Sequence, residues 1–383
     1  MTWAESAFRV LVPATSANLG PGFDTLGLAL RLHDEVEARV TPAGLDLSVT
    51  GESAGDVAEA GDKHLVVRAM RATFDDLGVS QPPGLALRCV NRIPHGRGLG
   101  SSAAAIVAGI LAARALAGAN TSADAALPLA SDLEGHPDNV APCLYGGLTI
   151  AYFPGGYTPT PQTPHLHGVL SVESGSPAGP REIAGTPHGS PEARSSAAQN
   201  RPAVASGSPA RPRETVEATG TVGGFTPRVM RLEVLPEIIP VAIIAPEPVS
   251  TELTRGLLPE RVPHADAARN AGRAALLIAA LTARPGALLD ATEDWLHQDY
   301  RAPAMPATHD LVRRLRAAGI PAVVSGAGPS VLVFLQAAVP GSRVMDSAVL
   351  DSTVRETGIG WLISSLDVER RGASVAPVVP SAR

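Results

Sequence analysis

The stretch Pro-His-Gly-Arg-Gly-Leu-Gly-Ser-Ser-Ala-Ala, from Pro94 to Ala104, decides the fold of this chain. Its three glycines stand at alternate positions, and glycine adopts backbone dihedrals that are closed to residues with a Cβ. Consecutive N–H groups can therefore converge on one point, where the helix that follows adds its unpaired amides and positive dipole end. The stretch predicts a polyphosphate site, in which Ser101 and Ser102 contribute hydroxyls to a phosphate oxygen or to its Mg²⁺.

A glycine-rich turn before a helix can also be purely structural, and this alternative stays open for the stretch taken alone. The two common nucleotide signatures are excluded. A dinucleotide-binding fingerprint needs an acidic residue on a second strand about 20 positions later, where this chain has Ala119-Asn120-Thr121-Ser122. A P-loop needs a lysine after its glycines, and the only lysine of the chain is Lys63.

Length and composition indicate a two-domain protein. The 383 residues are enough for two domains, each with its own core. A formal net charge of −6 argues against a nucleic-acid-binding surface. The first residues lack the pattern of a signal peptide, and no run of about 18 apolar residues occurs. We therefore expect a cytoplasmic protein with neither nucleic-acid nor membrane partners.

Strand and helix patterns alternate in both halves, which predicts an α+β protein of two lobes with a cleft between them. Period-two and apolar runs predict strands over 8–13, 34–40, 45–50, 85–90, 146–152, 229–234, 240–245, 322–325 and 330–335. Helical spacing predicts helices over 64–77, 103–111, 122–134, 267–281, 287–295 and 308–318. We expect 34–40 and 45–50 to pair as a hairpin through the turn at 41–44.

Pro, Gly, Ser, Thr and Ala dominate residues 154–227, which predicts a disordered insertion. A partner-binding role is the alternative, although the segment lacks aromatic anchors. No acid or cysteine completes a metal-ligand set around His165, His167 and His188, so these histidines are left unassigned. The expected domains are 1–153, the insertion at 154–227, a second domain at 228–370 and a flexible tail at 371–383.

Five further polar strings accompany the glycine stretch, and each taken singly is compatible with a turn or a helix cap. They are Pro-Ala-Thr-Ser-Ala-Asn-Leu-Gly-Pro-Gly-Phe-Asp at 13–24, Glu-Gly-His-Pro-Asp-Asn at 134–139, Ser-Thr-x-x-x-Arg at 250–255, Leu-His-Gln-x-Tyr-Arg at 296–301 and Ser-Gly-Ala-Gly-Pro-Ser at 325–330. Together, in order and spacing, they resemble the GHMP small-molecule kinases and, within them, the homoserine kinase family. The resemblance covers 1–153 and 229–340, and the insertion departs from it.

The resemblance implies a two-lobed GHMP kinase fold, with a ribosomal-protein-S5-domain-2-like N-terminal lobe, a ferredoxin-like C-terminal lobe and the active site in the cleft between. It implies transfer of the γ-phosphoryl group of ATP to the side-chain hydroxyl of L-homoserine, a step towards threonine, with Mg²⁺ as the metal. The expected nucleotide contacts are Pro94, His95, Gly96, Arg97, Gly98, Leu99, Gly100, Ser101, Ser102, Ala103 and Ala104.

The resemblance also implies which residues recognise the amino acid. Arg255 and Arg301 match the carboxylate-binding arginines of the family, and their planar guanidinium groups suit that anion. Asp24, with Asn18, is expected to hold the ammonium group. Thr251 is a further expected substrate contact.

For the chemical step, Asn139 and His136 are expected to orient the attacking hydroxyl, with Asp138 nearby. Phosphoryl transfer depends on alignment and charge neutralisation more than on a strong base. Asp138 is the candidate if a base exists. Gly326 to Gly328 are expected to approach the phosphates or the substrate from the second lobe, with a tight hairpin turn as the alternative.

Mg²⁺ is expected to bridge the β- and γ-phosphates, with Ser102 as a ligand. Glu134 is the carboxylate named for the same ion, with Asp132 behind it. Other functions stay open: a GHMP kinase for another alcohol such as shikimate or mevalonate, or a non-catalytic nucleotide-binding relative. The first would have no use for Asp24, and the second would be expected to have lost the loop serines or an arginine. A homodimer also stays open.

Overall fold

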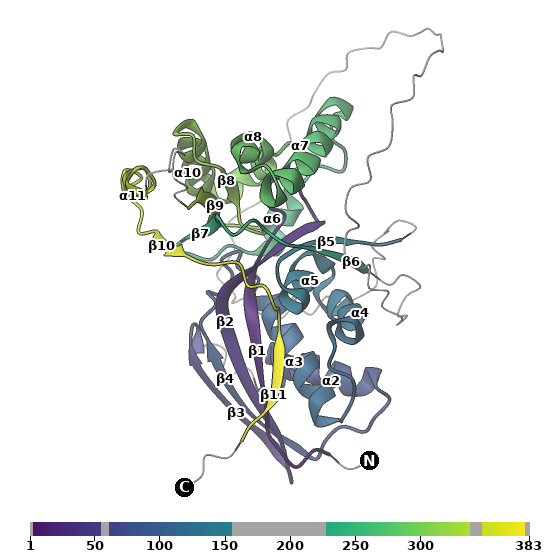
Figure 1. Cartoon of the computed structure of the whole chain (residues 1–383). Helices are drawn as coiled ribbons and strands as arrows, with labels where there is room; N and C mark the ends of the chain where they lie inside the picture. The colour runs from purple at the N-terminus through teal and green to yellow at the C-terminus, as the bar shows by residue number, and fades with distance from the viewer. Residues whose placement is uncertain (1–2, 55–60, 155–226, 338–346, 380–383) are drawn as a thin grey trace, which may run out of the picture.

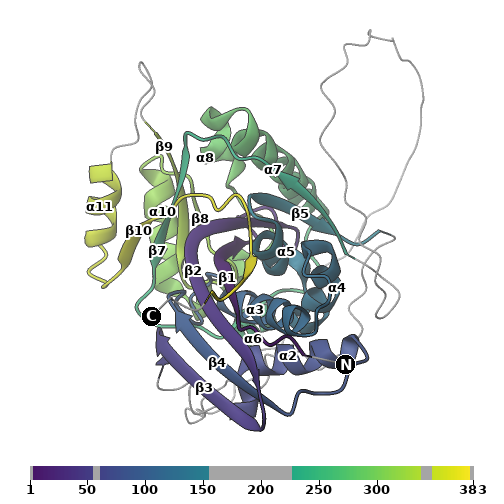
Figure 2. The same cartoon turned by 60° about the horizontal axis from the view of Figure 1, so that its bottom comes forward.

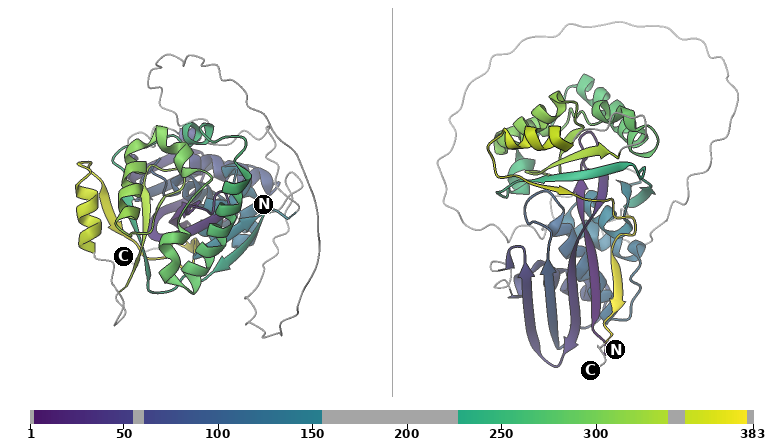
Figure 3. Two further views of the ribbon diagram at one scale, coloured as in Figure 1. Left: turned by 90° about the horizontal axis from the view of Figure 1, so that it is seen from above. Right: turned by 60° about the vertical axis from the view of Figure 1, so that its left-hand side comes forward.

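The computed structural model describes residues 3–54, 61–154, 227–337 and 347–379, which form two lobes, one above the other (Figure 1). The first lobe holds a seven-stranded sheet in the order β11-β1-β2-β4-β3, with β5 paired to β2 and β6 to β5. Its strands are β1 (Phe8–Ala17), β2 (Leu26–Thr41), β3 (Gly44–Gly51), β4 (Gly84–Asn91), β5 (Leu148–Tyr152), β6 (Arg228–Leu232) and β11 (Ser374–Pro377). Four helices pack together on one side of this sheet (Figure 3): α2 (Leu65–Asp76), α3 (Ser101–Leu116), α4 (Ala123–Glu134) and α5 (Pro137–Tyr145).

The hairpin expected between 34–40 and 45–50 is wrong. β3 runs parallel to β4, with Leu45 opposite Leu85, and β4 lies between β3 and β2. Both Thr41 and Gly44 lie opposite Gly84, so the short turn passes over the start of β4 instead of folding β3 back on β2. A Cβ on Gly84 would overlap this turn, which explains the glycine. Figure 2 shows β2 bending around the side of the lobe on which α3 lies.

Close packing of helices forms the core of the first lobe. Every residue of α3 from Ile106 to Leu116 is buried, and most of them are alanine or small aliphatic residues. Gly109 lies against the backbone of α2, where a Cβ would overlap the carbonyl oxygen of Val66. The low aromatic content therefore reflects helices that approach one another closely.

The second lobe has the ferredoxin-like fold that the resemblance to the GHMP kinases implies. Its sheet has the order β10-β7-β9-β8 with all neighbours antiparallel, formed by β7 (Ile238–Ile244), β8 (Ala322–Val324), β9 (Val331–Gln336) and β10 (Leu362–Ser365). Its longer helices are α7 (His264–Thr282), α10 (Pro306–Ala317) and α11 (Ser347–Arg355). Helices α7 and α10 precede β8 and α11 precedes β10, which gives the strand–helix–strand–strand–helix–strand order of this fold.

Three short helices complete the second lobe: α6 (Thr251–Gly256), α8 (Leu288–Ala291) and α9 (Gln298–Arg301). The helix predicted over 287–295 ends early, at Ala291. Asp294 accepts hydrogen bonds from the amides of His297 and Gln298, which form a turn that leads into α9. Among the described residues, no helix has both the length and the apolar character needed to cross a membrane.

The lobes are not contiguous blocks of sequence. The chain returns to the first lobe after β10, and β11 pairs with β1, with Val375 opposite Val10. The flexible tail expected from 371 onward is therefore wrong for 374–377, because this segment completes one edge of the sheet. The strand β6, assigned to the second domain by the boundary at 228, also belongs to the first sheet. The insertion predicted over 154–227, apart from its end residues, and His165, His167 and His188 lie outside the described residues.

Candidate active site

The glycine stretch links β4 to α3, as predicted, and lies against the second lobe. Gly96, Gly98 and Gly100 have φ values of 64°, 71° and 69°, in the left-handed region that side chains with a Cβ rarely adopt. A Cβ on Gly98 would overlap the backbone of Ser325 in the second lobe, and a Cβ on Gly100 would overlap the side chain of Thr15. Glycine is thus required here both for conformation and for space.

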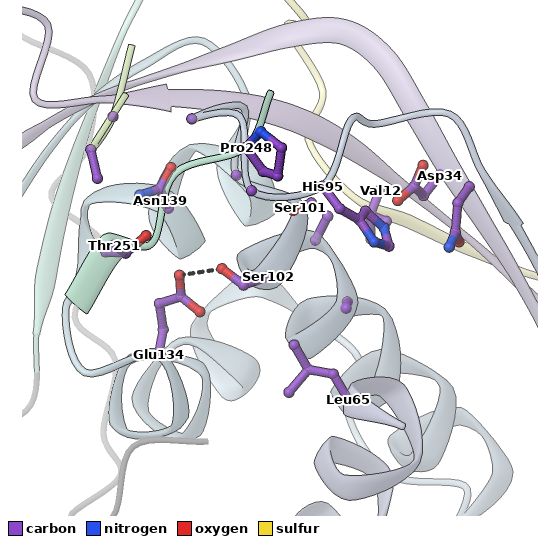
Figure 4. Close-up of a pocket in the computed structure, with 18 of the residues that line it drawn as sticks. Val12, Asp34, Leu65, His95, Ser101, Ser102, Glu134, Asn139, Pro248 and Thr251 are labelled. Atoms are coloured by element: carbon purple, nitrogen blue, oxygen red, sulfur yellow. Dashed lines mark hydrogen bonds between the residues drawn. The ribbon is translucent and has the colours of Figure 1, made fainter. Parts of the chain in front are cut away.

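Helix α3 begins immediately after this loop without a side-chain cap. Its N-cap is Gly100, so its first amides are free to bind an anion. Ser102 follows in the first turn and donates a hydrogen bond to Glu134 Oε1 at 2.8 Å, as Figure 4 shows. Glu134 ends α4 and is buried. The structure therefore brings together the two predicted metal ligands, which lie 32 positions apart in sequence.

A cavity of about 560 Å³ runs along the loop between the lobes, a volume typical of a cofactor or substrate site. Figure 4 shows Ser101 and Ser102 between two groups of lining residues. Glu134, Asn139 and Thr251 lie on one side, and Asp34, His95 and Leu65 lie on the other. The first group, with Asn18, His136, Asp138, Arg255 and Arg301, contains nearly all of the predicted substrate and catalytic residues.

The residues of the loop divide into three sets. Those that line the cavity are His95, Gly96, Gly98, Gly100, Ser101, Ser102 and Ala104. Pro94, Leu99 and Ala103 are buried beneath it. Arg97 is directed to the second lobe, where it donates to the carbonyl oxygen of Pro246 at 2.6 Å. The sequence could not separate these sets, because cavity-lining and buried residues follow one another in the loop without a regular period.

Helix α5 presents the predicted catalytic residues in its first turn. His136 is the N-cap, and its Nδ1 contacts Asp138 Oδ1. Burial disfavours charge on both side chains, but Asp138 raises the pKa of His136 and His136 lowers the pKa of Asp138, so an imidazolium–carboxylate pair is favoured. Asn139 donates to the same Asp138 oxygen at 3.4 Å and accepts from Thr15 Oγ1 at 2.9 Å. Asp138 thus holds the side chains of both His136 and Asn139.

The predicted ammonium and carboxylate sites meet across the two lobes. Arg255 Nη2 donates to Asp24 Oδ1 at 2.9 Å, although 231 positions separate them in sequence. Asn18 Oδ1 accepts from the Asp24 amide at 2.9 Å, and Asn18 Nδ2 donates to the carbonyl oxygen of Gly326 at 2.8 Å. Both Asn18 and Asp24 have positive φ, so this loop holds a fixed and uncommon shape. Asp24 is not among the residues that line the cavity, and it reaches the site through its ion pair with Arg255.

Arg301 is 1% exposed and lines the same cavity. Burial and, to a smaller extent, the nearby Arg255 together lower its pKa to about 10, so the guanidinium stays charged at neutral pH. Its Nη1 donates to His297 Nδ1 at 3.1 Å and to the carbonyl oxygen of Gly326 at 3.2 Å. Because His297 Nδ1 accepts, its Nε2 carries the proton and donates to the carbonyl oxygen of Gly20 at 2.9 Å. Within the described residues, Arg301 Nε has no hydrogen-bond partner.

Sequence reasoning missed the far end of the cavity. It is lined by Val12, Asp34, Val36, His64, Leu65, Val66 and Asn91. His64 is 4% exposed, neither ring nitrogen has a hydrogen-bond partner among the described residues, and burial lowers its pKa to about 4. Asp132, named behind Glu134, does not line the cavity. In the sequence, His64 is a polar residue directly before an amphipathic helix. This position is also typical of a residue that only caps the helix, so the pattern does not indicate a binding site.

The chain is similar to known proteins in both sequence and fold. Residues 64–147 match the family described as GHMP kinases N terminal domain. Homoserine kinase from Streptomyces avermitilis is 44% identical over 376 residues, which cover 97% of each chain. Homoserine kinase from Clavibacter michiganensis is 42% identical over 97% of this chain and 94% of the relative. A crystal structure of homoserine kinase from Cytophaga hutchinsonii has a TM-score of 0.66 at 22% identity, covering 98% of this chain and 99% of that one.

The two-lobed fold and the glycine loop at the start of a buried helix place the chain in the GHMP kinase class. The sequence identity to the curated relatives extends over nearly the full length of the chain and includes both lobes. The chain belongs to the homoserine kinase family.

Proposed function

We propose that this protein transfers the γ-phosphoryl group of ATP to the side-chain hydroxyl of L-homoserine, giving O-phospho-L-homoserine and ADP on the route to threonine. The observation that carries the proposal is that one cavity is lined both by the glycine loop and by Arg255 and Arg301. An anion site at a helix N-terminus and a clamp for a second, amino-acid anion then lie side by side. Such an arrangement suits a kinase that acts on a small amino acid.

The nucleotide would lie along the loop. Its phosphates would meet the amides at the start of α3. Its base would lie at the far end of the cavity, where Leu65 and Val66 provide apolar surface and His64 and Asp34 provide hydrogen-bonding groups. This end is also the part of the cavity that the amino-acid clamp leaves free.

The donors at Ser102 and Glu134 fit Mg²⁺, because a hydroxyl and a carboxylate are the hard oxygen ligands that this ion prefers. When bound, the ion would neutralise charge on the phosphates. Two protein ligands are in keeping with an ion that is held mainly by phosphate and water. Glu134, rather than Asp132, is the carboxylate we assign, since only Glu134 lines the cavity.

The amino acid would separate Asp24 from Arg255. Its ammonium group would take the place of Arg255 on Asp24, and its carboxylate would bind Arg255 and Arg301. A zwitterion satisfies both members of this pair at once, whereas an uncharged alcohol satisfies neither. Thr251, at the start of α6, lines the same end of the cavity.

In the chemical step, the substrate hydroxyl oxygen bonds to the γ-phosphorus as the bond from that phosphorus to ADP breaks, and the hydroxyl proton is released. Asn139 and His136 would orient the hydroxyl. The ion pair between His136 and Asp138 keeps Asp138 engaged, which argues against a free general base at this position. Alignment and charge neutralisation would then account for catalysis.

A coupled assay of ADP release tests the proposal with homoserine, threonine, serine, mevalonate and shikimate as acceptors. We expect homoserine to give the highest kcat/KM, with no turnover of mevalonate or shikimate. Highest activity on any other acceptor would overturn the substrate assignment. A homodimer and a cytoplasmic location stay predictions.

A further inference from the structure

Protein groups outside the glycine loop hold three of its carbonyl groups. The carbonyl oxygen of Gly96 accepts from the Val249 amide at 3.1 Å, and that of Leu99 accepts from the Thr15 amide at 3.1 Å. The carbonyl oxygen of Gly98 accepts from the Ser325 hydroxyl at 2.6 Å. Two of these three donors, Val249 and Ser325, belong to the second lobe, so the second lobe helps to shape a loop of the first.

These three hydrogen bonds fix the direction of the next amides in the chain. In a planar trans peptide, the C=O of one residue and the N–H of the next point in opposite directions. The amides of Arg97, Leu99 and Gly100 therefore point away from the groups that hold the carbonyls. Across the described part of the chain, none of these three amides donates to another protein group. Buried or half-buried amides left free in this way bind anions.

Ser325 is the only side chain among the three donors, and its hydroxyl has one proton to give. Its oxygen lies 2.8 Å from Ser16 Oγ as well as 2.6 Å from the Gly98 carbonyl oxygen. Because a carbonyl can only accept, Ser325 donates to Gly98, and Ser16 is the donor between the two hydroxyls. Both serines are 0% exposed. The hydrogen bond from the Ser325 amide to the Ser330 carbonyl oxygen, at 2.9 Å, fixes the backbone that carries this hydroxyl.

We propose that Ser325 is a positioning residue for the nucleotide phosphates: through the Gly98 carbonyl it fixes the Gly98–Leu99 peptide, and so it holds the cavity-lining residues Gly98 and Gly100 in the shape that binds phosphate oxygens. The inference rests on the proposed kinase function and adds a role for a residue that contacts neither substrate. Without the hydroxyl, the Gly98 carbonyl loses this hydrogen bond, the Gly98–Leu99 peptide is held less firmly, and the anion site is less preorganised before any ligand arrives.

Ser330 provides a matched control. It lies in the same turn of the second lobe and is also 0% exposed, but its hydroxyl accepts from the Ala245 amide at 3.2 Å, and no hydrogen bond among the described residues joins this hydroxyl to the loop. Ser330→Ala therefore removes an equally buried hydroxyl of the same lobe and leaves the Gly98 carbonyl held. Ser16→Ala is a second comparison, because Ser325 keeps its own proton for Gly98 in that variant.

The test is titration calorimetry of the full chain with the Mg²⁺ complex of a non-hydrolysable ATP analogue, together with KM values for ATP and homoserine. We expect Ser325→Ala to weaken analogue binding about fivefold to tenfold, the usual effect of losing one hydrogen bond. The KM for homoserine should change less than about twofold. Ser330→Ala and Ser16→Ala should keep analogue affinity within about twofold of the parent. Equal effects of Ser325→Ala and Ser330→Ala, or no effect of either, would overturn the inference.

Ser325→Cys covers the case in which Ser325→Ala does not fold, because the thiol fills the site but is a weak donor. It should weaken analogue binding in the same direction, and unchanged affinity would count against the inference. Analogue binding by the parent protein distinguishes a failure of this inference from a failure of the proposed function. A parent that does not bind the analogue contradicts the kinase proposal, whereas a parent that binds it and a Ser325→Ala variant that binds equally well contradict only the role of Ser325.

Discussion

Arg255 and Arg301 line the same cavity, although their exposure to solvent differs. The Arg255 side chain is 38% exposed and paired with Asp24, whereas Arg301 is buried. We expect Arg255→Ala and Arg301→Ala each to raise the KM for homoserine at least tenfold and the KM for ATP less than threefold, because the proposed function assigns both arginines to the amino-acid carboxylate. Steady-state kinetics with each substrate varied separately measures both values.

Arg301→Lys is the control for geometry. A lysine keeps the positive charge but cannot reproduce the contacts with both His297 and the Gly326 carbonyl oxygen, so it should not restore the KM. If the two KM values rose in parallel in the Arg255→Ala and Arg301→Ala variants, these residues would not form a carboxylate clamp.

Glu134 and Asp132 lie two residues apart on α4, yet only Glu134 contacts Ser102. We expect Glu134→Gln to raise the free Mg²⁺ concentration needed for half-maximal activity roughly tenfold, since an amide is a weaker ligand than a carboxylate. Asp132→Asn is the matched control and should leave this concentration unchanged. An Mg²⁺ dependence that shifts equally in both variants would remove Glu134 from the metal site.

Asp34 makes the folded state sensitive to pH. Burial raises its pKa to about 6, although the amides of Arg92 and Ile93 donate to its Oδ1. The folded protein therefore keeps a proton that the unfolded chain loses near pH 4, and this stabilisation is present below about pH 4 and lost as the pH rises through about 6. Asp34→Asn keeps an acceptor oxygen without the charge, and should raise the free energy of unfolding at pH 7.5 by roughly 2 kcal/mol.

Chemical denaturation of the nucleotide-free protein from pH 4 to 7.5 measures this effect, with the exposed Asp46→Asn as control. If the Asp34→Asn variant kept the parental slope of stability against pH, Asp34 would not be the group with the raised pKa.

Asp34 and His64 also show the limit of prediction from sequence at the residue scale. The sequence predicted site residues that lie within recognisable motifs. It does not show that an isolated Asp or His is buried beside a cavity.

At the scale of elements, the close approach of α2 and α3 gives a prediction of opposite sign for two glycines. Gly109 lies inside α3 against the Val66 carbonyl oxygen, whereas Gly272 lies on α7 with nothing within 4 Å of its Cβ position. Gly109→Ala should lower the free energy of unfolding by about 1–3 kcal/mol through overpacking. Gly272→Ala should raise it by about 0.5–1 kcal/mol through helix propensity.

Urea denaturation of the two variants beside the parent measures both changes in the free energy of unfolding. If Gly109→Ala had parental or higher stability, α2 and α3 could move apart without cost.

Element prediction succeeded where periodicity was strong, as for α2, α4, α7 and α10. It missed α5, because Gly135 ends α4 in a left-handed conformation and Pro137 begins the next helix two residues later. Both are turn signals as well as helix signals, and only tertiary packing distinguishes the two outcomes.

At the scale of the molecule, the site exists only because the lobes meet. The hydrogen bonds Asn18–Gly326, Arg255–Asp24 and Ser325–Gly98 each join segments more than 200 positions apart. No local pattern contains such pairs. The order and spacing of the motifs, through their resemblance to the GHMP kinases, predicted which residues belong to the site. They did not predict which of these residues contact one another.

The return of the chain to the first lobe is the feature that the sequence least revealed, and it predicts that the C-terminal strand is structural. β11 covers one edge of β1, Val375 packs against the core and the Val378 amide donates to the Ala7 carbonyl oxygen at 2.8 Å. Deletion of 374–383 would expose the backbone of β1, the strand that leads into the loop with Asn18 and Asp24. We expect a loss of roughly 2 kcal/mol in unfolding free energy and a lower Tm, because several ladder hydrogen bonds and one half-buried apolar side chain, that of Val375, disappear. Deletion of 380–383 alone, which leaves β11 in place, should melt with the parent in the same calorimetric scan. If the two truncated proteins melted together, β11 would add nothing to the stability of the sheet.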